Sequence, residues 1–134
     1  DRLLQEGPRP DVVLVTGRPA DAGFNPVTQI SFRVDGLRAL RAMHAHLAGE
    51  PVTDVQAVSH GNALSVYFRD PEGNRIELFI DTPWYVSQPL RIPMDLSLPD
   101  DGLWKWVEET ARPLPGFKPR EEWRREMTAR MGAR

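Results

Sequence analysis

Four side chains in this sequence are of types that support acid–base or metal chemistry: Gln29, His60, Tyr67 and Glu77. A carboxylate and an imidazole can ligate a divalent metal or move a proton, and a phenol can position a substrate. Gln29, Tyr67 and Glu77 lie on the polar faces of predicted strands. His60 opens a hairpin beside Gly61, whose missing side chain would let another group approach. We therefore expect the four side chains to share one surface.

The hairpin over residues 59–82 organises the chain. Polar and apolar residues alternate on both sides of a central turn, which predicts two half-buried strands. The turn is Asp-Pro-Glu-Gly-Asn over residues 70–74: Pro fixes φ, Gly tolerates a positive φ, and Asp and Asn bond to nearby backbone. A hairpin symmetric about Glu72 places Tyr67 opposite Glu77, although a single β-bulge would displace this pair.

The residues before the hairpin predict a strand over 28–35, a helix over 36–49 and a weaker strand over 51–58. Asp35 is placed to cap the helix. Residues 12–15 form a further short apolar run, which predicts another strand. The chain is therefore expected to be α+β, with one aliphatic sheet face against the helix. The predicted buried face of the helix comprises Leu37, Leu40, Met43 and Leu47.

The composition divides the chain into a module over residues 1–90, with its core at 28–81, and a proline-rich helical extension over 91–134. Within the extension we predict helices at about 101–112 and 119–131. We expect this C-terminal tail to pack as an arm on the body or on a partner. Its second helix has an apolar stripe formed by Trp123, Met127 and Met131.

The composition is that of one ordinary soluble domain. The chain has 134 residues, a net charge of −2 and 40% hydrophobic residues, so we expect no nucleic-acid partner. It has no cysteine, which excludes disulfides and thiolate metal sites. No apolar run approaches membrane-spanning length and no signal peptide is evident, so we expect a cytoplasmic protein without a membrane partner.

The hairpin resembles the closing hairpin of the vicinal oxygen chelate superfamily, which holds glyoxalases, bleomycin- and fosfomycin-resistance proteins and extradiol ring-cleaving dioxygenases. The resemblance begins with Asp-Pro-x-Gly-Asn-x-x-Glu over residues 70–77, where turn and carboxylate have a fixed spacing. It extends to His-Gly at 60–61, to the tyrosine ten residues before the glutamate, and to Asp-Thr-Pro-Trp-Tyr at 81–85. These features are most similar to the C-terminal module of an extradiol catechol dioxygenase.

The resemblance implies a βαβββ module, two of which pair into a cup around a divalent metal, usually Fe(II) and less often Mn(II). Glu77 then matches the carboxylate ligand, Tyr67 a tyrosine that bonds to the catechol, and His60 a histidine on the distal side of the site. Gln29 stands where a metal-binding histidine is usual. An amide oxygen is a poorer ligand for Fe(II), although some glyoxalases use Gln with Glu. The chain has room for about one module, so a homodimer or another module would complete the cup.

Three functions are open at this point. The first is extradiol cleavage of a catecholic aromatic, with His60 as the acid–base or O₂-side donor and Tyr67 positioning the substrate. The second is a glyoxalase- or isomerase-like site, in which Gln29 and Glu77 are doubled across a dimer around Ni, Zn or Mn. The third is a metal-free module that binds a small aromatic or a drug. Structural roles are open as well: a solvated glutamate, a packed tyrosine and a loop histidine.

Overall fold

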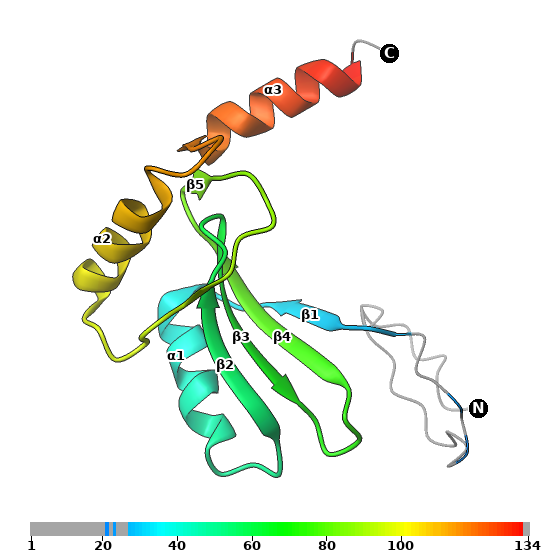
Figure 1. Cartoon of the computed structure of the whole chain (residues 1–134). Coiled ribbons are helices and arrows are strands. Elements are labelled where there is room, and N and C mark those ends of the chain that lie inside the picture. Colours follow the sequence, from blue (N-terminus) through cyan, green and yellow to red (C-terminus); the bar gives the residue numbers. More distant parts are fainter. Residues whose placement is uncertain (1–20, 22, 24–26, 133–134) are drawn as a thin grey trace, which may run out of the picture.

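A five-stranded sheet lies at the centre of the computed structural model, which describes Asp21, Gly23 and residues 27–132 of the chain (Figure 1). The strand order is β1-β4-β3-β2-β6, with β1 parallel to β4 and every other neighbouring pair antiparallel. The fold is therefore α+β, as expected. In chain order the elements are β1 (Ile30–Arg33), α1 (Gly36–Leu47), β2 (Thr53–Ser59), β3 (Ala63–Arg69), β4 (Arg75–Asp81), β5 (Trp84–Tyr85), β6 (Ile92–Pro93), α2 (Asp100–Ala111), β7 (Lys118–Pro119) and α3 (Arg120–Gly132).

The β3–β4 hairpin has the register that the turn predicts. Tyr67 pairs with Glu77, and the pairing runs along both strands without a shift. The turn is closed by Asp70, whose carboxylate accepts the backbone N–H of Asn74 at 2.8 Å. Gly73 adopts a φ of +82°, which a residue with a side chain rarely tolerates. The local turn chemistry therefore fixes which side chains stand side by side on the sheet.

Helix α1 covers one face of the sheet and forms the core with it (Figure 1). Three of the four helix residues predicted to be buried are buried, but Met43 is 40% exposed. At 100° per residue Met43 points roughly 120° away from Leu37, at the border of the apolar stripe. Asp35 occupies the N-cap position without a capping hydrogen bond from its side chain. The core comprises Leu37, Leu40, Leu47, Leu64, Val66, Leu78, Ile80, Met94, Leu96, Leu103 and Val107.

The C-terminal tail contains both predicted helices, and they behave differently. Helix α2 buries Leu103 and Val107 completely, and both belong to the core. Helix α3 extends away from the sheet and has no buried residue within its described length (Figure 1). Of its apolar stripe, Trp123 packs on the body, stacked on Tyr85 with ring centroids 4.7 Å apart, and packing of the tail on a partner stays a prediction. Met131 is 67% exposed.

Three further expectations concern the lengths of β1 and β2, the strand predicted near the N-terminus, and membrane-spanning helices. The strands predicted at 28–35 and 51–58 are present as β1 and β2, the first of them shorter than predicted. The strand predicted at residues 12–15 lies outside the described residues. Within the described part of the chain, no helix has the length and apolar composition needed to cross a membrane.

Candidate functional site

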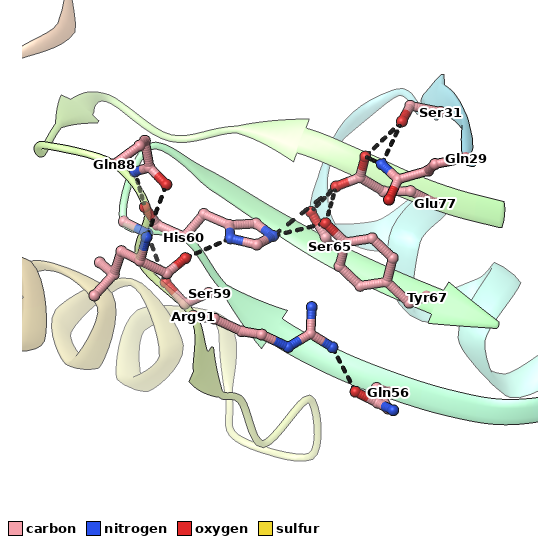
Figure 2. Close-up of polar contacts among 12 residues, drawn as sticks. Gln29, Ser31, Gln56, Ser59, His60, Ser65, Tyr67, Glu77, Gln88 and Arg91 are labelled. Atoms are coloured by element: carbon pink, nitrogen blue, oxygen red, sulfur yellow. Dashed lines mark hydrogen bonds and ion pairs between the residues drawn. The ribbon is translucent and has the colours of Figure 1, made fainter. Parts of the chain in front are cut away.

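The face of the sheet opposite α1 carries a row of side chains that crosses four strands. Gln56 on β2 pairs with Tyr67 on β3, Tyr67 pairs with Glu77 on β4, and Glu77 pairs with Ser31 on β1. Successive residues of a strand point to opposite faces, so this row and the aliphatic core come from the same strands. Gln29 lies two residues before Ser31 and reaches the same row (Figure 2). The predicted gathering of Gln29, Tyr67 and Glu77 is confirmed.

The carboxylate of Glu77 accepts a hydrogen bond from each of four side chains (Figure 2). Its Oε2 accepts from Gln29 Nε2 at 2.8 Å and from Ser31 Oγ at 2.6 Å. Its Oε1 accepts from Ser65 Oγ at 2.8 Å and from the Tyr67 hydroxyl at 2.7 Å. Burial alone would raise the pKa of Glu77, but bonds from Ser31, Tyr67 and Ser65 outweigh it and hold that pKa below its ordinary value. The group is an ionised carboxylate at neutral pH.

His60 reaches the same network through Tyr67. Its Nδ1 lies 2.6 Å from the carbonyl oxygen of Leu90, and its Nε2 lies 2.8 Å from the Tyr67 hydroxyl. Burial, followed by the hydrogen bond to Glu77 and its charge, raises the pKa of Tyr67 to about 12. Gly61 holds the loop close to the body, since a Cβ there would lie 2.5 Å from the Val86 side chain. All four predicted site residues therefore belong to one connected network.

The protons of this network can be counted. A backbone carbonyl only accepts, so His60 Nδ1 carries a hydrogen that it donates to Leu90. Tyr67 has one hydroxyl hydrogen, which it donates to Glu77. His60 Nε2 lies 2.8 Å from the Tyr67 oxygen, a distance at which two acceptors would repel, so Nε2 either donates to that oxygen or shares the Tyr67 hydrogen with Glu77. A hydroxyl group of a ligand can therefore serve His60 as an acceptor or as a donor.

A hollow of about 420 Å³ opens beside this network. Its wall includes Arg120, the first residue of α3, whose guanidinium donates to the carbonyl oxygens of Thr82, at 2.7 Å, and Asn62. Arg120 also forms an ion pair with Asp81 at 3.3 Å. The C-terminal tail thus contributes to the wall of the hollow. The lining residues are Ser31, His60, Asn62, Ala63, Tyr67, Glu77, Phe79, Asp81, Gln88 and Arg120.

The donor set of this chain alone does not fit a resident divalent metal. Both oxygens of Glu77 already accept two hydrogen bonds each. Gln29 turns its amide nitrogen, and not its oxygen, toward the carboxylate, because two acceptor oxygens would repel at 2.8 Å. His60 Nε2 stands 4.0 Å from Glu77 Oε1, with Tyr67 bonded to both groups. Within the described residues, no three His, Cys, Asp or Glu side chains are grouped to hold a metal ion.

Several residues of the site were not singled out from the sequence. Ser31 and Ser65 could have been found, because each lies two residues from a predicted site residue on the same strand face. The sequence has no comparable pattern that marks Leu90, Arg91 and Arg120. Tertiary packing sets the position of the segments that carry them, and Leu90 contributes only its backbone carbonyl.

The chain was compared with family models, with curated proteins and with solved structures, and no match was found among any of them. The function is therefore inferred from the residues and the geometry of the site.

Proposed function

We propose that this chain is a module of the vicinal oxygen chelate type. The strand–helix–strand–strand–strand order of β1, α1, β2, β3 and β4 supports this, as does the pairing order β1-β4-β3-β2 with β1 parallel to β4. The polar row on the open face brings Tyr67 beside Glu77, the two residues for which the resemblance implies site roles. The module joins its tail through β6 and α2.

We propose that the module binds a small hydroxylated aromatic molecule in the hollow, using its own side chains. The observation that carries this proposal is the saturated Glu77 carboxylate, which holds Tyr67 in place and occupies its only hydroxyl hydrogen. His60 lies at the wall of the hollow and is held there by its contacts with Tyr67 and Leu90. A phenolic hydroxyl of the ligand would hydrogen-bond to His60, and the ring would lie beside Phe79. A volume of about 420 Å³ is within the range of small-molecule sites.

The proposal is tested by calorimetric titration of catechol into protein that has been treated with a chelator. We expect binding without added metal, and a loss of about ten-fold or more in affinity for His60→Phe, because the hydrogen-bond partner of the ligand hydroxyl is removed. His44→Phe is the matched control, since His44 lies on α1, away from this hollow. Binding that is absent without metal and restored by it would contradict the proposal.

A second candidate is a metal-dependent enzyme that forms only when another copy or module is added. It is favoured by the nearness of Gln29, which precedes β1, to Glu77 on β4, and by His60 at the wall of the same hollow, but Gln29 would have to turn its amide oxygen toward the metal. The partner would have to supply the missing ligands for Fe(II), or for Mn, Zn or Ni. In this assembly His60 and Tyr67 would orient a catechol and hold a proton at His60 Nε2.

Metal analysis together with sedimentation distinguishes the candidates. A dimer that retains Fe and takes up O₂ when catechol is added supports extradiol activity. A dimer that retains Zn, Ni or Mn without O₂ uptake supports the glyoxalase- or isomerase-like alternative. Catechol binding by the chelated protein, with no metal retained after anaerobic reconstitution, supports the binding module and contradicts both enzymes.

A further inference from the structure

Two arginines lie on the ring of Tyr67. The guanidinium carbon of Arg75 is 4.7 Å from the ring centroid, and that of Arg91 is 4.8 Å from it. Arg75 comes from β4, whereas Arg91 comes from the segment just before β6. Because both groups face one ring, their charges lie within about 10 Å of each other, which is comparable to the screening length in physiological salt.

Neither arginine has a carboxylate partner among the described residues, although most arginines packed against the sheet have one. Arg33 and Arg120 share Asp81, and Arg69 lies 3.8 Å from Asp54. The nearest polar partner of Arg91 is the amide oxygen of Gln56, which is uncharged. The ring of Tyr67 is the other partner, and a cation–π contact offsets only part of the cost of holding two like charges together.

The pair also offers hydrogen-bond donors that are not used. Arg75 Nε is buried and has no hydrogen-bond partner within the described structure. Arg91 is exposed, so its guanidinium is open to solvent and to ligands. Buried polar groups are normally paired, so Arg75 leaves one donor unsatisfied where solvent does not reach it, and Arg91 is the arginine that a ligand can contact. Tyr67 itself is only 7% exposed and is bonded at its hydroxyl, so it forms a rigid platform between the arginines and the hollow.

We infer that Arg91 and Arg75 form an anion subsite, and that the ligand of the hollow is an aromatic molecule that carries a carboxylate. The inference rests on the proposed function, because the subsite adjoins the hollow through Tyr67. The exposed Arg91 contacts the carboxylate directly, and its planar fork suits two parallel bonds. The less exposed Arg75 adds positive charge and holds the ring from β4. A phosphate ester presents similar chemistry and is the other possible source of the anion.

The alternative is that the two arginines only cover Tyr67. In that case their removal would lower the stability of the fold and would leave the choice of ligand unchanged. An anion subsite predicts the opposite pattern, in which the preference for a charged ligand changes while the fold stays intact. The two explanations therefore differ in a ratio of affinities, which a general loss of folded protein does not alter.

The test compares catechol with 3,4-dihydroxybenzoate, which differs by one carboxylate, in calorimetric titrations of the full chain. We expect the carboxylated ligand to bind roughly ten-fold more tightly to the wild type, and this preference to shrink as salt is added. Arg91→Gln should remove most of the preference, Arg75→Gln about half of it, and Arg91→Lys should give an intermediate result because it keeps the charge without the fork. Arg38→Gln, an exposed helix arginine, is the matched control and should leave the ratio unchanged.

Phenyl phosphate and benzoate complete the experiment. Competition by phenyl phosphate that depends on Arg91 supports the subsite and identifies a phosphate as its preferred anion. Equal affinities for catechol and 3,4-dihydroxybenzoate in the wild type, or a preference that survives Arg91→Gln and Arg75→Gln, would overturn the inference and leave the binding module standing. Benzoate that binds through Arg91 while catechol does not bind at all would overturn the proposed function and support the subsite. If none of these ligands binds, both proposals are wrong.

Discussion

The two faces of the central sheet are built from alternate residues of the same strands, yet they are organised in different ways. On the face under α1, Leu64, Val66 and Leu78 are buried in an apolar core. On the other face, Tyr67 and Ser65 are also buried, but they hold a carboxylate in a hydrogen-bonded network. Burial alone accounts for the first face. The second face buries polar groups that a stable sheet does not need.

This difference separates residues that stabilise the fold from residues that position the side chains of a site. Burial of an apolar face stabilises the folded state in proportion to the area that is removed from water. A polar network roughly balances the loss of water against internal hydrogen bonds, so its net contribution to stability is small. Its main result is geometric, because Glu77, Tyr67 and His60 are held in fixed orientations at the wall of one hollow. Substitutions on the two faces should therefore affect different measurements.

The largest effect is expected on the apolar face. Leu64→Ala should lower the free energy of unfolding by about 2–5 kcal/mol, because it leaves a cavity at a side chain with no exposed surface. Denaturant titration measures this loss, and ligand affinity per folded molecule should stay the same. Val55→Ala, at a side chain that is 40% exposed on β2, is the control and should cost less than about 1 kcal/mol. A comparable loss at both positions would remove the distinction between core and surface on which the comparison depends.

Glu77→Gln should have a smaller effect on stability and a larger effect on the site. An amide oxygen cannot accept all four bonds, so we expect a loss of about 2 kcal/mol, together with weaker catechol binding. The folded-state pKa of Glu77 lies below its ordinary value of 4.5, so its contribution is present above that pH and is lost as the pH falls through the folded-state pKa. The wild type should therefore lose more stability in acid than the variant does. Equal acid profiles, measured by denaturant titration, would contradict this role of the carboxylate.

Tyr67→Phe examines the same network at high pH. The pKa of Tyr67 is raised from 10.0 to about 12, so its hydroxyl stabilises the fold below pH 10, and this contribution is lost as the pH rises toward 12. At neutral pH the variant should lose about 1.5 kcal/mol through the missing hydrogen bonds. The difference in phenolate absorbance between the wild type and the variant should titrate near pH 12. A midpoint close to 10 would mean that the hydroxyl is not held in the network.

The sequence predicts the local register of the hairpin, but it does not predict the contacts between distant segments. The register of Tyr67 and Glu77 could be predicted because a five-residue turn determines it locally. The parallel pairing of β1 with β4, which brings Ser31 to Glu77, depends on contacts far apart in the sequence and has no local pattern. The position of the Leu90 carbonyl beside His60 depends on the path of the whole segment after β4.

The same limit applies to the C-terminal tail. The prolines and the apolar periodicity locate α2 and α3 correctly, because both are local signals. These local signals do not show which of the two apolar stripes is buried against the rest of the protein. Leu103 in α2 is buried, whereas Met131 in α3 is exposed, although each belongs to a predicted apolar set. Arg120 begins α3, and its contact with Asn62 joins the tail to the hollow through a pairing that no local pattern indicates.

The smallest effect distinguishes the two serines that bond to Glu77. Ser65 has no exposed surface, so Ser65→Ala removes a donor from a place that water cannot refill, and we expect a loss of about 1 kcal/mol in unfolding free energy. Ser31 is exposed, and in Ser31→Ala water can take its place at Glu77 Oε2, so the loss should be about 0.5 kcal/mol. Denaturant titration of both variants and of the double variant measures the difference. If Ser31→Ala cost more, the network would be held from its exposed edge at β1, and burial on the polar face would not explain its rigidity.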